Sequence, residues 1–283
     1  MEERKPSQTA VAAAGYRAAH QVLDGGRIFS DPLACAVLGP EADTIIGALT
    51  GDAAHTRARV FMAARSRFAE DSLAVAVARG VRQAVVLGAG LDTSGLRNPH
   101  ADQGLRTFEV DHPATQAWKL KRIADAGLSA PASLIFAAID LEREDLGHGL
   151  LAAGFDPHQP AFFLWLGVVP YLRPAAISAT LRYIAGVPGA EVVFDYSEPL
   201  ENYPPDRRAE MVALGSHAAQ AGEPWLSHFD PADIARELKG LGLGDQEDLD
   251  VAGIAVRYLG VPAVGPAAPG PHVMRARRGE GGR

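Results

Sequence analysis

A glycine-rich turn follows a four-residue apolar run. Residues 84–87 lead directly into Gly88-Ala89-Gly90, and Asp92 and Thr93 come soon after. Glycine lets the backbone turn tightly and lets a ligand approach the main chain closely. A dinucleotide-binding fingerprint requires a third glycine where this chain has Thr93, so the pattern favours a ligand without a pyrophosphate. The alternative is a plain turn from strand to helix.

Acidic residues end the next two apolar segments. Glu109 and Asp111 close the second segment about 20 residues after the glycines, where Rossmann-like sites hold ribose hydroxyls with a carboxylate. Both lie on one side of a strand, so we expect only one to reach a ribose. The alternative role for Asp111 is to cap the following helix. Asp140 ends the third segment, where a carboxylate can accept the adenine amino group while Leu141 lies on the ring.

A fourth apolar segment carries the side chains that an acceptor substrate would meet. It runs from Phe162 through Gly167 to Tyr171 and Leu172. Tyr171, Tyr196 and Trp225 either line an acceptor pocket or are core aromatics with a polar group. The candidate bases are four histidines whose spacing fits no metal motif such as His-Glu-x-x-His, so we expect no metal. They are His20, His112, His217 and His228.

Alternating apolar runs and helical segments position these residues. Strands are predicted at 84–87, 105–110, 134–139, 161–166 and 191–196, with a helix at 114–126 and another opening near residue 173. This alternation requires right-handed crossovers, and therefore a parallel sheet covered on both faces. We expect one domain over residues 1–283, with a helical cap at 1–80, a ligand-binding core at 81–196, a lid insertion at 197–230 and closing elements at 231–283. The closing elements would supply a helix at 231–239 and strands at 241–249 and 272–277, and Ser30-Asp31-Pro32 predicts a helix start within the cap.

Composition excludes several classes of protein. Hydrophobic residues make up 47% and charged residues 22%, which is the balance of a globular domain. The formal net charge of −7 disfavours a nucleic-acid partner. No apolar stretch approaches the ~18 residues of a membrane span, residues 1–5 are charged rather than apolar, and Cys35 stands alone. We therefore expect a cytoplasmic protein without disulfides.

Several segments together resemble the leucine carboxyl methyltransferase family. The strongest are ARSRFAEDSL, GVRQAVVLGAGLDTSGLR and FEVDHPATQAWK, all between residues 64 and 119. The motifs Asp31-Pro32, Gly222-Glu223-Pro224-Trp225 and Arg257-Tyr258-Leu259 extend the resemblance over most of the chain. Within this family, the chain most resembles the bacterial O-methyltransferase branch that includes a carboxyl methyltransferase of tetracenomycin biosynthesis.

The resemblance implies a fold, a cofactor and a set of binding residues. The fold would be the Rossmann-like class I methyltransferase α/β sheet of seven strands, with the last strand antiparallel, and the cofactor would be S-adenosylmethionine. Arg65 would hold the methionine carboxylate through its guanidinium fork, although a one-turn shift in the alignment would give this role to Arg67. The remaining implied contacts are the turn of Gly88, Ala89 and Gly90 under the cofactor, Asp111 on the ribose, and Asp140 with Leu141 on the adenine.

One position departs from the family pattern. Members usually read Trp-Glu-Gly after the fourth strand, and this chain has Trp165-Leu166-Gly167. The lost carboxylate implies a more apolar acceptor pocket, weaker cofactor binding or loss of catalysis. The expected activity is methylation of a carboxylate or hydroxyl of a small molecule, with a slight preference for carboxylate because no strong base candidate is present. The alternatives are a protein C-terminal carboxyl methyltransferase, an inactive cofactor-binding scaffold and a nicotinamide-dependent oxidoreductase.

Overall fold

The computed structural model describes residues 7–262 and 269–279 and contains one mixed sheet of seven strands. The strand order is β3-β2-β1-β4-β5-β7-β6. Strand β7 runs antiparallel to both of its neighbours, β5 and β6, and the other pairings are parallel. The expected class I methyltransferase fold is therefore confirmed. The strands are β1 (Gln83–Leu87), β2 (Arg106–Asp111), β3 (Leu134–Ala138), β4 (Ala161–Trp165), β5 (Glu191–Ser197), β6 (Asp245–Leu249) and β7 (Pro271–Arg277).

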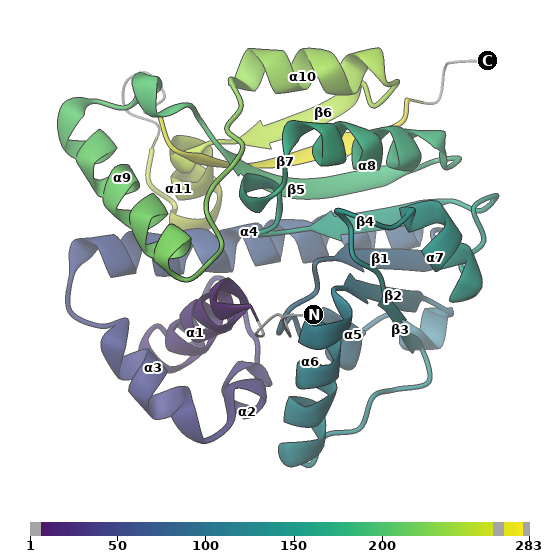
Figure 1. Ribbon diagram of the computed structural model, residues 1–283, viewed down its shortest axis with the longest axis horizontal. Helices are drawn as coiled ribbons and strands as arrows, with labels where there is room; N and C mark the ends of the chain where they lie inside the picture. The colour runs from purple at the N-terminus through teal and green to yellow at the C-terminus, as the bar shows by residue number, and fades with distance from the viewer. Residues whose placement is uncertain (1–6, 263–268, 280–283) are drawn as a thin grey trace.

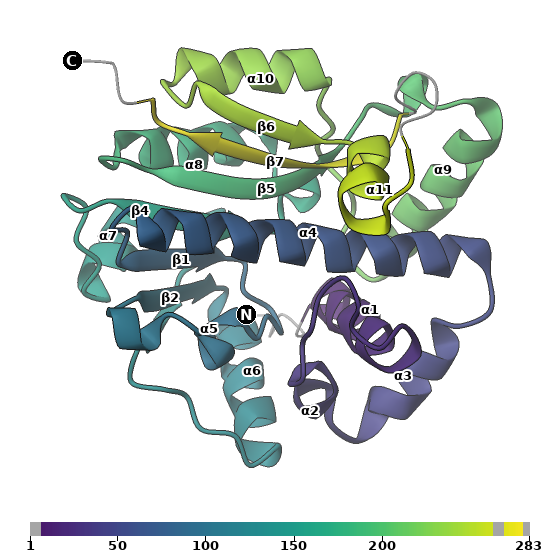
Figure 2. The same ribbon diagram turned by 180° about the vertical axis from the view of Figure 1, so that it is seen from behind.

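Helices cover both faces of the sheet (Figures 1 and 2). Within β1, Val85 and Leu87 belong to a core cluster on one face, while Ala84 and Val86 belong to a second cluster on the other. This alternation follows from the period of two in a strand, and a strand buried on both faces is apolar throughout. The first cluster lies under α7 (Leu146–Ala152), α8 (Pro174–Gly186) and α10 (Pro231–Gly240), and the second under α4 (Ala53–Ala78) and α11 (Val251–Leu259).

Three helices precede α4: α1 packs against α4, and α2 and α3 pack against α1 and against each other (Figure 2). They are α1 (Gln8–Leu23), α2 (Ala34–Leu38) and α3 (Ala42–Ala48). The helix start predicted at Ser30-Asp31-Pro32 comes too early, because α2 begins at Ala34 with Leu33 as its N-cap, so the helix is not capped by the side chain of Asp31. Its buried carboxylate accepts a hydrogen bond from Arg17 at 2.9 Å and one from Thr93 at 2.8 Å. Asp31 thereby ties α1 to the turn that follows β1.

Three other α-helices occur in the described residues. They are α5 (Ser94–Arg97), α6 (Pro113–Asp125) and α9 (Pro205–Gln220). Helix α9 stands apart from the sheet beside the N-terminal end of α4, and Met211 is its one buried residue (Figure 1). No helix in the described ranges is long and apolar enough to cross a membrane. The charged residues 1–5 and most of the stretch between Val261 and Pro271 lie outside those ranges.

Candidate functional site

A cavity of about 680 Å³ opens at the carboxyl ends of β1, β2, β3 and β4. The sheet order reverses between β1 and β4, and open α/β sheets bind ligands at such a switch point. The first turns of α1 form one wall, and residues 221–226, which follow α9, form another. The cavity therefore combines the strand ends at which the sequence predicted ligand-binding residues with two segments that lie far away in the chain.

The turn after β1 can be built only with glycine at two positions. Gly88 has φ +63°, and a Cβ there would lie 2.4 Å from Cγ2 of Val168. Gly90 has φ +46°, and its Cβ would lie 2.8 Å from the Cβ of Ala10. Between them, the backbone N–H of Ala89 donates to the carbonyl of Val110 at 3.0 Å. The turn thus forms a narrow floor at which a ligand meets main chain rather than side chains.

Of the two acidic residues on β2, Asp111 is the one that reaches the cavity. Its Oδ2 accepts from the N–H of Gly90 at 2.5 Å and its Oδ1 from the N–H of His112 at 2.7 Å. Burial raises the pKa of Asp111 from its ordinary value. The N-cap of α6 is His112, whose Nδ1 accepts from the N–H of Ala114 at 3.2 Å. The carboxylate of Asp111 therefore stays at the cavity wall, held by the glycine turn.

Glu109 lies away from the cavity and is 1% exposed. Its Oε2 accepts a hydrogen bond from the ammonium of Lys119 at 2.6 Å, and its Oε1 has no hydrogen-bond partner among the described residues. Burial raises the pKa of Glu109 to about 7, although Lys119 opposes this rise. The pair is part of the packing between β2 and α6 and does not contact the cavity.

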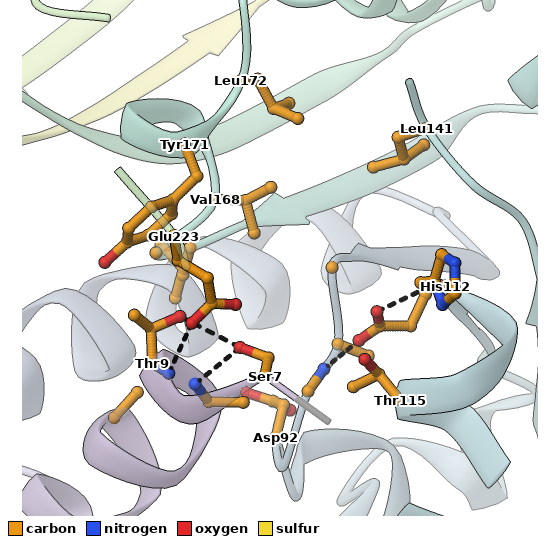
Figure 3. Close-up of a pocket in the computed structure, with 18 of the residues that line it drawn as sticks. Ser7, Thr9, Asp92, His112, Thr115, Leu141, Val168, Tyr171, Leu172 and Glu223 are labelled. Carbon is orange, nitrogen blue, oxygen red and sulfur yellow. Dashed lines mark hydrogen bonds between the residues drawn. The ribbon is translucent and has the colours of Figure 1, made fainter. Parts of the chain in front are cut away.

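The third strand end forms the far side of the cavity. Asp140 and Leu141 both line it, and Oδ1 of Asp140 accepts from the N–H of Glu142 at 3.0 Å. Figure 3 shows Leu141 near His112 and Thr115, on the opposite side from Tyr171 and Thr9. A flat apolar group at this end would have Leu141 against it and carboxylates from two neighbouring strands around it.

Arg65 is buried at the floor of the cavity, and Arg67 is not. Arg65 is 6% exposed, and its Nη1 donates to Oδ2 of Asp195 at 2.5 Å. Oδ1 of the same carboxylate accepts from the N–H of Gly167 at 2.5 Å. Arg67 is exposed, pairs with Asp71 at 2.8 Å and does not line this cavity. Of the two arginines that the alignment left open, Arg65 is the one that the cavity can use.

Leu166 lines the cavity, next in the chain to Gly167, against which Arg65 packs. Its side chain packs against the core cluster under α4. The position that carries a carboxylate in most family members is thus an apolar part of the wall here.

Of the three aromatic residues predicted to line an acceptor pocket, one lines the cavity and two do not. Tyr171 lines the cavity, and burial raises its pKa from the ordinary value. Tyr196 does not reach the cavity, because it is 2% exposed and its hydroxyl donates to Asp248 at 2.7 Å. Trp225 does not line it either, but its chain neighbours Pro224 and Leu226 do.

Two carboxylates that sequence reasoning did not select belong to the site. Glu223 accepts from the N–H of Thr9 at 2.9 Å, so residues 221–226 are joined to the start of α1 across the cavity (Figure 3). Glu223 belongs to the Gly-Glu-Pro-Trp motif, so the motif was the available signal, although the sequence prediction selected its tryptophan. Asp195 gave no such signal, because it lies inside the apolar run of β5 and its partner Arg65 is 130 positions away.

The donor set around the cavity fits S-adenosylmethionine. The cofactor has an adenine amino group, a ribose diol and an amino-acid carboxylate; Asp140, Asp111 and Arg65 all line the cavity and are complementary to these three groups respectively. The glycine floor suits a ligand that lies against main chain. No group of three or more potential metal ligands occurs in the part of the chain that the structure describes.

The fold and the donor set of the cavity are those expected of class I S-adenosylmethionine-dependent methyltransferases. The fold aligns with that of magnesium protoporphyrin IX methyltransferase (ChlM) from Synechocystis PCC 6803 with bound SAH, over 95% of this chain and all of that one, with a TM-score of 0.50 and 13% identity. The model of the leucine carboxyl methyltransferase family matches residues 10–185. The chain therefore belongs to the leucine carboxyl methyltransferase family.

Bacterial relatives agree with this assignment. YktD of Bacillus subtilis (strain 168), a candidate S-adenosyl-L-methionine-dependent methyltransferase, is 34% identical over 184 residues, which are 64% of this chain and 60% of YktD. A protein of the same description from Mycolicibacterium smegmatis is 33% identical over 216 residues, 71% of this chain and 70% of the relative. The matched segment thus spans about 60 to 70% of these relatives' own length. The expected cofactor, S-adenosylmethionine, agrees with the descriptions of both.

Proposed function

We propose that this chain transfers a methyl group from S-adenosylmethionine to a carboxylate oxygen of a small molecule of bacterial secondary metabolism. The observation that carries the proposal is the grouping of Asp111, Asp140 and Arg65 around a single cavity at the switch point of the sheet. When bound there, the cofactor supplies a sulfonium methyl group that an acceptor oxygen takes in line, leaving S-adenosylhomocysteine.

The chain's own residues orient the two reactants and exclude water. Arg65 binds the amino-acid end, Asp111 and Asp140 bind the nucleoside end, and the wall at Leu166 and Val168 keeps the space between them apolar. Holding reactants in line contributes much of the rate in such a transfer, because the methyl group is already activated.

The acceptor end favours an anionic oxygen. His112 is the one histidine among the described residues that line the cavity, and it lies at the nucleoside end with Nδ1 engaged by the N–H of Ala114. An ionised carboxylate needs no general base, whereas a phenol with a pKa of about 10 benefits from one. Because burial raises the pKa of Tyr171, its hydroxyl stays protonated and is able to donate a hydrogen bond to the acceptor. Arg173 lines the same side and forms no ion pair with any described residue.

We further propose that residues 197–230 act as a lid in a single domain. Helix α9 buries Met211 alone, and an exposed ion pair between Arg57 and Glu210, 2.8 Å long, joins it to α4. The segment after α9 reaches the cavity mouth and binds α1 through Glu223. The sparse attachment of α9 suits a helix that moves aside to admit ligands, while Ser227, whose Oγ donates to the carbonyl of Leu172 at 2.6 Å, anchors the far end of the segment.

The first experiment is calorimetric titration of the protein with S-adenosylmethionine and, in parallel, with NADH. Binding of S-adenosylmethionine alone is expected, whereas binding of NADH alone supports the oxidoreductase alternative and overturns the proposal. Transfer of a labelled methyl group is then measured with small carboxylic acids, small phenols and a peptide with a free C-terminal carboxylate. Labelling of the peptide alone would favour the protein-methylating alternative.

The scaffold alternative has its own test at Leu166. It predicts cofactor binding without transfer to any acceptor in the panel, and transfer restored by Leu166→Glu. Our proposal predicts transfer by the natural sequence, since Leu166 forms part of an apolar wall rather than a gap in the binding set.

A further inference from the structure

Three elements meet at one buried carboxylate beneath the cavity. Asp195, on β5, is 5% exposed and does not itself line the cavity. Its two oxygens accept from Nη1 of Arg65, on α4, and from the N–H of Gly167, in the turn after β4, each at 2.5 Å. A single side chain thus fixes both the arginine and the turn that faces it.

The arrangement leaves Arg65 little freedom. Gly167 has φ +72°, and a Cβ there would lie 2.9 Å from Nη2 of Arg65, so the guanidinium packs directly against the turn. The guanidinium also lies over the ring of Phe61, with the ring centroid 6.0 Å from Cζ. With Nη1 held by Asp195, the guanidinium plane is set, and the edge left for a ligand is set with it.

We propose that Asp195 is a positioning residue for the amino-acid end of the cofactor, acting through Arg65 and Gly167. This rests on the proposed function, because it assumes that Arg65 binds the methionine carboxylate. Asp195 touches neither cofactor nor acceptor. It holds the guanidinium and the Gly167 turn in the arrangement that the incoming carboxylate meets.

Two physical effects oppose each other when Asp195 is neutralised. Loss of the negative charge leaves Arg65 a stronger attractor for an anion. The Asn amide, however, keeps only one acceptor oxygen for two donors, so its NH2 group must face either Nη1 of Arg65 or the N–H of Gly167, and the guanidinium or the turn that faces it is displaced. A charge-assisted bidentate contact depends on geometry within tenths of an ångström, so we expect orientation to dominate and binding to weaken.

The experiment compares two ligands that differ only at the amino-acid end. S-adenosylhomocysteine carries the carboxylate, and 5′-methylthioadenosine has the same nucleoside and sulfur without it. Calorimetric titration of Asp195→Asn is expected to show about tenfold weaker binding of S-adenosylhomocysteine and unchanged binding of 5′-methylthioadenosine. Asp248→Asn is the matched control, because it removes a carboxylate that hydrogen-bonds Tyr196 and His272 outside the cavity, and it should change neither affinity.

Asp195→Glu keeps the charge but moves the carboxylate by one methylene, and it should give the same selective loss while preserving charge balance in the interior. Equal weakening of both ligands, no weakening, or tighter binding of S-adenosylhomocysteine overturns the inference and leaves the proposed function standing. Failure of both variants to fold gives Asp195 a purely structural role and overturns it too. Absence of binding of either ligand to the natural protein contradicts the proposed function itself.

Discussion

Replacement of Gly88 by alanine separates two physical contributions at the cofactor floor. A side chain at φ +63° costs about 1–2 kcal/mol of stability, because Cβ approaches the carbonyl oxygen. The new Cβ would also lie 2.4 Å from Cγ2 of Val168, and relieving such an overlap costs a further 1–3 kcal/mol or so. Gly88→Ala should therefore lower the free energy of unfolding by about 2–5 kcal/mol.

Gly127→Ala is the matched control for strain alone. Gly127 has φ +66°, and a Cβ there would have no atom within 4 Å, so only the first cost of about 1–2 kcal/mol applies. Urea denaturation followed by circular dichroism gives both values. Adding Val168→Ala to Gly88→Ala removes the overlapping Cγ atoms and leaves Cβ at 3.4 Å, so it should recover most of the difference.

The same variants connect the floor to ligand binding. Gly88→Ala shifts the turn or the Val168 wall and should weaken binding of S-adenosylhomocysteine, whereas Gly127→Ala lies outside the cavity and should leave it unchanged. If Gly88→Ala matches Gly127→Ala in both stability and affinity, the close approach of the two strand-end turns plays no part in the site.

Three further predictions concern charged groups. Asp111→Asn should weaken S-adenosylhomocysteine binding by about 10- to 100-fold in calorimetric titration, because an ionised acceptor for the ribose is lost; unchanged affinity would contradict this role. Lys119→Met leaves the Glu109 carboxylate buried without its cation and should cost about 3–5 kcal/mol in urea denaturation. Lys121→Met, at an exposed ion pair, should have little effect, and equal losses in the two variants would refute the reasoning. His272 lies 3.0 and 3.2 Å from two carboxylates, which raise its pKa despite its burial, so its contribution to stability is complete below about pH 6.5 and declines as pH rises through the folded-state pKa. Thermal melts across this range should show that decline in the natural protein and a flatter profile in His272→Gln; parallel profiles would contradict it.

The sequence predicted the strands of the core well because their chemistry is local. Strand β1 was expected at 84–87 and spans Gln83–Leu87, and β5 was expected at 191–196 and spans Glu191–Ser197. Buried parallel strands are short apolar runs bounded by turn residues, so each run carries its own evidence. The edge strand β6 was placed too early, at 241–249, because the glycines at 242 and 244 delay pairing until Asp245.

The sequence did not predict the short helices whose formation depends on tertiary packing. Helices α7 and α11 were not predicted, and each is a few turns at most. Their N-caps were visible in the sequence: Asp145 accepts from the N–H of His148, and Asp250 from that of Gly253. A single capping residue is too common a signal to define a helix without the core that α7 and α11 cover.

The site shows the same division between local and long-range information. Strand ends could be chosen from the sequence because carboxyl ends of parallel strands share one edge, and Asp111 and Asp140 both line the cavity. By contrast, the sequence could not predict which side chains of β5 point toward the cavity side of the sheet. Tyr196 belongs to the core cluster under α8, while its neighbour Asp195 turns the other way, toward Arg65. That pairing depends on how α4 crosses the sheet, which no local spacing records.

The most direct test of the account is a crystal structure of the protein with S-adenosylhomocysteine. We predict the adenine beside Leu141 and Asp140, the ribose hydroxyls on Asp111, and the carboxylate on the edge of Arg65 that Asp195 leaves open. Density for the ligand anywhere other than this cavity, or in the cavity with the nucleoside at the Arg65 end, would contradict the central claim.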